Sequence, residues 1–216
     1  MEIPHSVFQP IIDELERQPL EQNAYRIKAG EGRSQAFGVV NRRCLPPDAS
    51  RQNWKRPYLY KLLLDFGEKY VDISYNSITI NQNYRASKHY DKHNNGVSFL
   101  VAFGSYTGGD LLIHEGDLAG AHNIWCKPIK ANFSEVLHSV DMFIGNRYSI
   151  VYYMFDFPDM PSLPKFSVKE ENGRYYFYRG DEKITNGLPH PLRGRARKEI
   201  LETARKKKNA SNNTTS

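Results

Sequence analysis

Residues 96–104 read GVSFLVAFG and residues 147–155 read RYSIVYYMF, and these two stretches decide the class of fold. Both are short and rich in β-branched and aromatic side chains, which favours β-strands over helices. Four segments between them or just before them share this composition: NSITINQNY (76–84), DLLIH (110–114), AHNIW (121–125) and EVLHSV (135–140). Turn-forming sequences separate the segments. Many short, closely spaced strands predict a β-sandwich or jelly roll.

Helices are expected outside this run of strands. The spacing of apolar residues predicts one helix over residues 7–18 and a second over 56–70. Residues 24–28 and 34–41 have the composition of strands. AGEGR (29–33), which separates them, is glycine-rich and typical of a turn.

The strand run is expected to end at residues 157–165, which contain three prolines. Beyond them, Asn172 and Gly173 form a dipeptide typical of a tight hairpin turn, so we predict a last hairpin over 167–180. The overall expectation is a mainly β fold with helices packed outside it.

The excess positive charge of the chain lies near its C-terminal end. Residues 193–208, RGRARKEILETARKKK, carry eight Lys or Arg and two Glu, whereas the remainder balances 22 basic against 22 acidic residues. Such a segment fits a polyanionic partner, a nuclear import signal or a solvated helix with a frayed end. We expect a domain over residues 1–190 and a basic tail over 191–216, partly helical and then disordered.

Length and composition narrow the class of protein. The 216 residues suffice for one hydrophobic core and for no more than two. Cys44 and Cys126 are the only cysteines, which argues against a disulfide framework or a cysteine-rich zinc site. No apolar run approaches the roughly 20 residues of a membrane span, and the N-terminus does not resemble a signal peptide. We expect an intracellular monomer without a membrane partner, nuclear in a eukaryotic host and otherwise cytoplasmic.

Groups that can bind a metal are concentrated in KHYDKHNNG, residues 88–96. His89 and Asp91 are two residues apart, and on a strand such residues share a face, so both side chains can point into one cavity. One further histidine would complete the two-histidine, one-carboxylate set of non-heme Fe(II) oxygenases. That set leaves coordination positions open for oxygen and a cosubstrate.

The third ligand must come from elsewhere in the chain, and the candidates are His114, His122 and His138. We select His138 because it lies in a predicted strand, nine residues before Arg147. An arginine can hold a carboxylate through a bidentate fork, and Ser149, on the same strand face, can donate another hydrogen bond. We expect His138, Arg147 and Ser149 to form one wall of the cavity, and His89 with Asp91 to form the other.

These motifs together resemble the double-stranded β-helix dioxygenases that use Fe(II) and 2-oxoglutarate. Within them, the chain looks most like the TET/J-binding-protein family, which oxidises the methyl group of 5-methylcytosine or thymine in DNA. HYDKHNNG (89–96) is similar to the family's H-x-D-x-H-N pattern, and RYSIVYY (147–153) is similar to its R-x-S strand. Residues 24–43 also resemble the segment before the catalytic core of the animal enzymes. The resemblance covers roughly residues 24–155 and implies a jelly-roll, cupin-like core.

The resemblance implies Fe(II), 2-oxoglutarate and O2 as cofactor and cosubstrates, ascorbate as a support of activity, and DNA as partner. It implies that His89, Asp91 and His138 bind iron and form the catalytic set, that Arg147, Ser149 and Arg26 hold 2-oxoglutarate, and that Asn94, Tyr153, His93 and Arg42 contact the substrate. Asn94 would hydrogen-bond a flipped-out base and Tyr153 would stack on it. On this view Asn94→Ala impairs base oxidation while iron and 2-oxoglutarate still bind.

The chain also departs from the family pattern. Phe155 stands where the animal enzymes have a histidine that helps to read the base, and the sequence contains no cysteine-rich zinc module. Both departures leave the identity of the oxidised base open. Phosphate contacts are expected from a basic loop before the second helix, made of Arg42, Arg43, Arg51, Lys55 and Arg56.

Several functions are compatible with the sequence. The first is hydroxylation of a base methyl group in DNA, either 5-methylcytosine to 5-hydroxymethylcytosine or thymine to 5-hydroxymethyluracil. A prolyl- or lysyl-type protein hydroxylase would share the iron site, and an AlkB-like nucleic-acid demethylase is a variant of the first function. A β-sandwich binding module without catalysis is the alternative of a different class. Turnover of 2-oxoglutarate would exclude the last, and preference for DNA over peptide would separate the others.

Overall fold

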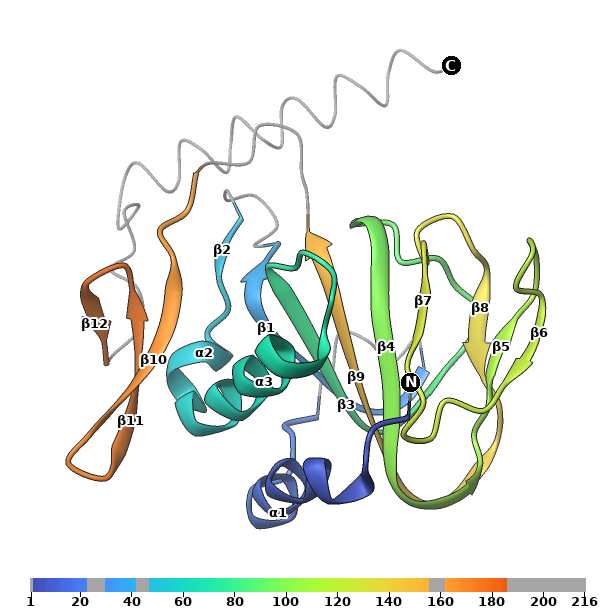
Figure 1. The fold of residues 1–216 in the computed structure, drawn as a ribbon, viewed down its shortest axis with the longest axis horizontal. Coiled ribbons are helices and arrows are strands. Elements are labelled where there is room, and N and C mark those ends of the chain that lie inside the picture. The colour runs from blue at the N-terminus through green and yellow to red at the C-terminus, as the bar shows by residue number, and fades with distance from the viewer. Residues whose placement is uncertain (1, 23–29, 42–46, 156–161, 186–216) are drawn as a thin grey trace.

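The computed structural model describes residues 2–22, 30–41, 47–155 and 162–185 (Figure 1). Its helices are η1 (His5–Phe8), α1 (Gln9–Arg17), α2 (Gln52–Lys55) and α3 (Pro57–Tyr70). Its strands are β1 (Gly30–Val40), β2 (Asp48–Ala49), β3 (Ser77–Ala86), β4 (Asn94–Gly108), β5 (Leu111–Ile113), β6 (Gly120–His122), β7 (Ile129–Ala131), β8 (His138–Val140), β9 (Phe143–Phe155), β10 (Phe166–Glu171), β11 (Arg174–Arg179) and β12 (Glu182–Ile184). The boundary that we expect before the basic tail falls outside these residues and stays a prediction.

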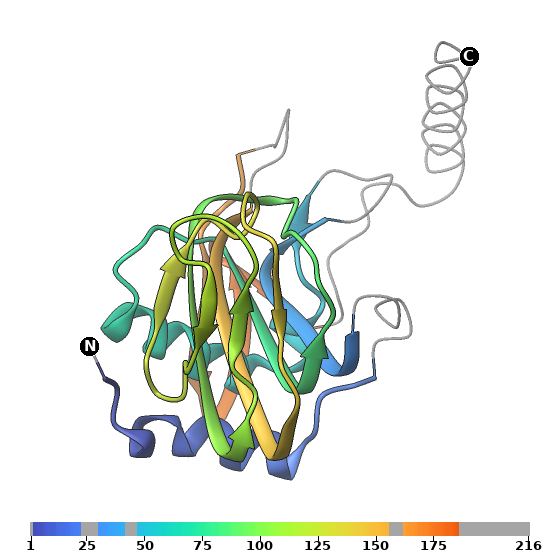
Figure 2. The same cartoon turned by 90° about the vertical axis from the view of Figure 1, so that its right-hand side faces the viewer.

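Two sheets form the body of the fold. The larger has six strands in the order β2-β1-β3-β9-β4-β7, and the smaller has three in the order β6-β5-β8. Figure 2 looks onto the smaller sheet, behind which the long strands of the larger sheet run. Apolar side chains from both sheets form one buried cluster between them, including Leu100, Ala102 and Ala131 of the larger sheet and Leu111 and Ile113 of the smaller.

The path of the chain is that of a jelly roll. From β3 to β9 the strands β3, β4, β7 and β9 belong to the larger sheet, while β5, β6 and β8 belong to the smaller. The segment between β3 and β4 also joins the smaller sheet, because His89 forms an isolated bridge with His138 of β8. Eight segments divided between two sheets in this way make the jelly-roll arrangement, which confirms the predicted mainly β fold with flanking helices.

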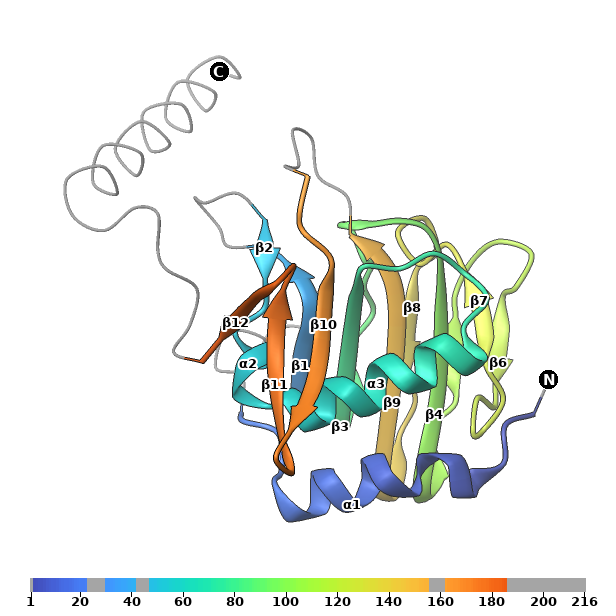
Figure 3. The same cartoon turned by 60° about the vertical axis from the view of Figure 1, so that its left-hand side comes forward.

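The two predicted helices are confirmed, and they cover the outer face of the larger sheet (Figure 3). Leu15 of α1 and Leu63 of α3 are fully buried in the same cluster as Ile150 and Tyr152 of β9. The hydroxyl of Tyr152 donates a hydrogen bond of 2.6 Å to the carbonyl of Leu63, which ties α3 to the sheet. Pro57 opens α3, where its missing N–H leaves no hydrogen bond unmade. None of the helices in the described part of the chain has the length and apolar character needed to span a membrane.

The predicted last hairpin is also confirmed, as β10 and β11. Asn172 and Gly173 have positive φ angles of 52° and 71°, which a tight two-residue turn requires. With β12 they form a third sheet that packs on α3, where the rings of Tyr58 and Tyr175 lie 4.7 Å apart.

One predicted turn is wrong. Gly30 to Arg33 of AGEGR belong to β1. The predicted strand over 24–28 lies outside the described residues. The register of β1 against β3 shifts between Glu31 and Arg33, so Gly32 sits at a β-bulge with φ of 111°. A side chain there would meet the carbonyl oxygen of Asn83 at 2.0 Å. The glycine therefore marks a close approach of two strands and not the end of one.

Candidate active site

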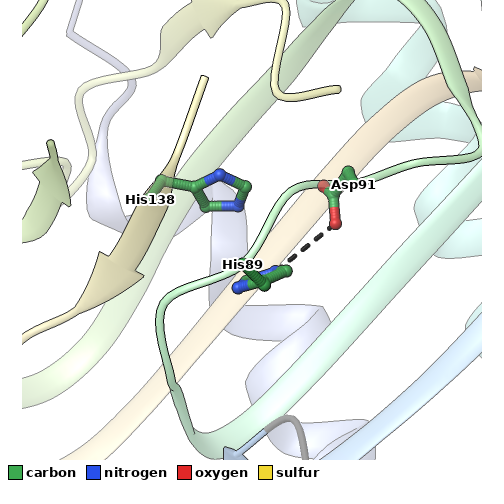
Figure 4. Close-up of side chains that lie close together, drawn as sticks. All are labelled: His89, Asp91 and His138. Atoms are coloured by element: carbon green, nitrogen blue, oxygen red, sulfur yellow. Dashed lines mark ion pairs between the residues drawn. The ribbon is translucent and has the colours of Figure 1, made fainter. Parts of the chain in front are cut away.

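Three side chains that can bind a metal converge in one pocket (Figure 4). One ligand atom from each of His89, Asp91 and His138 lies within 4.8 Å of the other two, and no other such group is found among the residues that the structure describes. Nε2 of His89 lies 3.4 Å from Oδ1 of Asp91, and the two imidazole rings have centroids 4.3 Å apart. The three residues that we select from the sequence are thus brought together.

Backbone pairing, and not a shared strand, positions the first two of these side chains. His89 and Asp91 lie in the connection between β3 and β4, outside the regular strands, where His89 forms a single bridge with His138. The N–H of His89 donates to the carbonyl of His138 at 3.0 Å, and the reverse hydrogen bond is 3.1 Å. The N–H of Asp91 donates to the carbonyl of Phe133 at 2.9 Å. These bonds hold the connecting segment against β8 and the chain before it.

Both imidazoles are held in the tautomer that suits a metal ligand. Nδ1 of His89 lies 2.7 Å from the carbonyl of Ser87, and Nδ1 of His138 lies 2.9 Å from the carbonyl of Val136. Because a carbonyl oxygen only accepts, each Nδ1 carries the proton and each Nε2 presents its lone pair. Burial lowers the pKa of His138, which favours the neutral ring. Two imidazole nitrogens and one carboxylate fit Fe(II).

A buried cation lies in the same pocket. The side chain of Arg147 is among the largest that are fully buried, and its Nε donates to the carbonyl of Gly109 at 3.1 Å. Its guanidinium lies over the rings of Tyr106 and Phe143, 5.5 and 5.7 Å from their centroids. No carboxylate of the described residues comes within ion-pair distance of it, and burial lowers its pKa. A bound carboxylate would offset the cost of this desolvated charge.

Ser149 lies two residues from Arg147, and the sequence reasoning missed its partner. Nδ2 of Asn81 donates to Oγ of Ser149 at 3.1 Å, so the serine oxygen accepts from Asn81 and its own proton remains to be donated. Asn81 stands opposite Ser149 in the pairing of β3 with β9. Only the register of the two strands identifies Asn81 as the partner of Ser149, because the sequence of β3 contains several other polar residues.

The walls of the pocket are divided differently from our expectation. Arg147 and Ser149 share one strand, as predicted, and this strand is β9 of the larger sheet. His138 lies on β8 of the smaller sheet, and it therefore shares a wall with His89 and Asp91 instead of with Arg147. The pocket between these walls holds about 710 Å³ of space, which includes open solvent at its mouth. We call it the inner pocket.

The inner pocket borders a second, more open hollow, which we call the outer hollow. It holds about 1030 Å³ of space including open solvent, and it shares Asp91, Asn94 and Tyr153 with the inner pocket. His93 and Phe155 lie on its wall, with ring centroids 6.1 Å apart. The predicted substrate residues Asn94, Tyr153 and His93 thus lie around the outer hollow, together with Phe155.

The remaining histidine candidates have other partners. Nε2 of His114 lies 2.8 Å from Oγ of Ser139, and Nε2 of His122 lies 2.6 Å from the carbonyl of Leu118. Neither belongs to the cluster of three ligands. The choice of His138 over these two therefore agrees with the geometry.

The described residues of the basic loop that we expect to bind phosphate have carboxylate partners within the chain. Arg51 and Lys55 lie 3.6 and 3.5 Å from the carboxylate of Glu21. Arg56 is buried and lies 3.6 Å from Glu14, which is buried as well. Arg26, Arg42, Arg43 and the basic tail lie outside the described residues, so their predicted roles stay predictions.

A substitution at Gly109 tests how tightly Arg147 is held. Gly109 has φ of 73°, and a Cβ there would lie 2.9 Å from both Cδ and Nε of Arg147. Gly116, with φ of 77°, has nothing within 4 Å of such a Cβ and serves as the matched control. Both alanine variants bear about 1–2 kcal/mol of left-handed backbone strain. Only Gly109→Ala adds overpacking, about 1–3 kcal/mol.

We therefore expect Gly109→Ala to melt at a lower temperature than Gly116→Ala and to bind 2-oxoglutarate more weakly, as measured by thermal unfolding and calorimetry. Equal melting temperatures and equal affinities in the two variants would contradict this account of the Arg147 contact.

No protein-family model matches the chain, and no curated protein matches it by sequence. Several solved structures are similar in fold at low identity. An oxidoreductase of the 2OG-Fe(II) oxygenase family from Burkholderia pseudomallei has 16% identity and a TM-score of 0.48, over 69% of this chain and 77% of that one. NgTET1 in complex with 5mC DNA has 14% identity and a TM-score of 0.48, over 71% and 69%. A prolyl-4-hydroxylase from Pseudomonas putida has 14% identity and a TM-score of 0.44, over 72% and 89%.

Proposed function

We propose that this protein is an Fe(II)- and 2-oxoglutarate-dependent dioxygenase that hydroxylates the methyl group of a base in DNA, either 5-methylcytosine or thymine. One observation carries the dioxygenase chemistry: the cluster of His89, Asp91 and His138 shares its pocket with Arg147, a buried cation. A metal site alone would need no such cation. Iron next to a cation fits a cosubstrate that bears one carboxylate at each end.

In this proposal each side chain has a defined task. Nε2 of His89, the carboxylate of Asp91 and Nε2 of His138 hold Fe(II), and Arg147 pairs with the distal carboxylate of 2-oxoglutarate. When bound, iron and 2-oxoglutarate supply the oxidising chemistry, in which O2 and 2-oxoglutarate give succinate, carbon dioxide and one hydroxyl group on the substrate. The hydroxyl of Ser149 donates a hydrogen bond to the same distal carboxylate of 2-oxoglutarate that pairs with Arg147.

The inner pocket also has apolar walls that keep water from the reacting groups. Leu100, Leu111 and Phe133 line it, and Phe133 packs against His138 with ring centroids 4.7 Å apart. Electrostatic interactions are stronger where water is excluded. The attraction between Arg147 and a bound carboxylate is therefore stronger in this pocket than it would be in water.

The outer hollow supports a planar substrate. Tyr153 and Phe155 give it aromatic walls, while Lys92 and His93 add groups that can meet a phosphate or the edge of a base. A base inside a duplex cannot reach a pocket of this kind, so it must be flipped out, and aromatic side chains then stack on it. We assign Tyr153 as the stacking residue and His93 as a contact of the substrate.

The test is nucleoside mass spectrometry of DNA after incubation with the protein, Fe(II), 2-oxoglutarate and ascorbate. DNA containing 5-methylcytosine and DNA containing only the ordinary bases are treated side by side. We expect a hydroxymethylated base in one of the two, and its identity names the substrate. Release of succinate without any modified base would contradict the DNA substrate and favour a protein hydroxylase with the same iron site.

A further inference from the structure

Asn94 makes hydrogen bonds that do not fit a residue which only reads a base. Its backbone N–H donates to the carbonyl of Asp91 at 2.9 Å, which closes a four-residue turn. Its side-chain Nδ2 lies 3.3 Å from Oδ2 of Asp91 and 3.2 Å from Oγ of Ser98. An ionised carboxylate only accepts, so the amide nitrogen must face Asp91. Both of its N–H groups are then engaged within the protein.

The local backbone is arranged to make this contact. In a regular strand, residues four apart are separated by about 13 Å, too far for Asn94 and Ser98 to meet. The pairing of β4 with β9 has a register shift between Asn95 and Phe99, and Gly96 within it has φ of 70°. This irregularity brings the fully buried Ser98 within hydrogen-bond distance of the Asn94 amide.

The two oxygens of Asp91 consequently have different surroundings. Oδ1 faces Nε2 of His89 at 3.4 Å, on the side of the metal cluster, whereas Oδ2 is held by Asn94. We infer that Asn94 is a positioning residue, which fixes the Asp91 carboxylate so that Oδ1 points toward the metal. The inference rests on the proposed function in one respect only, that the cluster binds a metal. It assigns to Asn94 a task that the family resemblance does not.

The two roles of Asn94 predict opposite results for metal binding. A base reader can be removed without effect on the metal, as the sequence motif alone suggests. A positioning residue cannot, because loss of a hydrogen-bonding partner of a metal ligand typically lowers metal affinity about 10–100-fold. We therefore expect Asn94→Ala to weaken Co(II) and Mn(II) binding by about 10-fold or more, and to change the absorption spectrum of bound Co(II), which reports the geometry of its ligands.

The experiment compares the full-length wild type with three variants by calorimetric titration with Co(II) and with Mn(II), Co(II) absorption and thermal unfolding. Ser98→Ala keeps the bond between Asn94 and Asp91 but removes its support, so we expect a smaller loss of about 3-fold. Asn95→Ala changes the exposed neighbour of Asn94 and should bind both metals like the wild type.

The possible results of this experiment separate the positioning role of Asn94 from the existence of the metal site. Wild-type affinity and an unchanged Co(II) spectrum in Asn94→Ala would overturn the positioning role. Failure of the wild type to bind either metal would instead overturn the metal site and with it the proposed function. If Asn94→Ala does not fold, Ser98→Ala decides: reduced affinity at an unchanged melting temperature supports the inference, and unchanged affinity contradicts it.

Discussion

Replacing His89 or Asp91 by alanine should abolish both metal binding and 2-oxoglutarate turnover while leaving the fold intact. Each change removes one of three ligands, so the loss of affinity should exceed the roughly 10–100-fold that follows from losing a partner of a ligand. The fold should survive because the two side chains are only partly buried, with exposures of 31% and 30%. The bridge to His138 is made by backbone atoms and remains. Titration with Co(II), succinate release and thermal unfolding measure these three properties.

His114→Ala is the matched control for these variants. His114 directly follows β5, which lies beside β8 in the smaller sheet. Its imidazole is hydrogen-bonded to Ser139 and does not belong to the ligand cluster. The variant should bind Co(II) and release succinate like the wild type. An active His89→Ala protein, or an inactive His114→Ala protein of normal stability, would refute the assignment of the ligands.

The sequence alone was enough to select the three side chains that the fold brings together, but not the way in which they meet. The spacing of His89 and Asp91 and the position of His138 before Arg147 were sufficient to select the three residues. Both residues lie outside the regular strands, in a connection that joins the smaller sheet only through the bridge of His89 with His138. Their convergence depends on hydrogen bonds to His138 and Phe133, about 40 to 50 residues further on. A pairing over such a separation leaves no periodic signal in the chain.

Composition and periodicity predict long elements and some short ones, since DLLIH, AHNIW and EVLHSV indicate β5, β6 and β8, which have three residues each. β3, β4, β9 and α3 each contain ten or more residues, enough for composition and periodicity to indicate their type. β7 and β12 are not predicted, because each contains a lysine and only one β-branched residue, a composition that does not indicate a strand. At Gly32 the sequence predicts a turn where the structure has a bulge, since a glycine marks either one in a sequence.

The charged residues show the limit of arguments from composition. Arg51, Lys55 and Arg56 are close together in the chain, which suggested a surface for phosphate. Glu21 lies within ion-pair distance of Arg51 and Lys55, and Glu14 of Arg56, so each of the three has a carboxylate partner from another part of the fold. Arg147, a single arginine between strand residues, is the cation that faces the inner pocket. The importance of a charge here depends on its burial and its partners and not on local charge density.

Arg147→Met should strongly weaken 2-oxoglutarate binding without lowering the stability of the unliganded protein by more than about 1 kcal/mol. The substitution removes the cation that we assign to the distal carboxylate, and truncating one partner of a buried, hydrogen-bonded charge pair costs about 2–5 kcal/mol. The affinity for 2-oxoglutarate should therefore fall by roughly two to three orders of magnitude, as measured by calorimetry with Mn(II) in place of iron. The unliganded protein, in contrast, no longer has to bury an arginine without a carboxylate partner among the described residues. Methionine fills a similar volume, so the free energy of unfolding should stay within about 1 kcal/mol of the wild type or rise.

Two further variants, Arg147→Lys and Arg85→Met, show whether weaker 2-oxoglutarate binding comes from loss of the guanidinium fork, of the positive charge, or of any arginine. Lysine keeps the charge but not the bidentate fork, so Arg147→Lys should bind 2-oxoglutarate more weakly than the wild type and more tightly than Arg147→Met. Arg85 is exposed and does not line the inner pocket, so Arg85→Met should bind it normally. Mn(II) affinity in the absence of 2-oxoglutarate should be the same in all four proteins, because Arg147 does not belong to the ligand cluster. Arg147→Met with normal 2-oxoglutarate affinity, or with a strongly reduced melting temperature, would mean that the buried guanidinium serves the fold and not the cosubstrate.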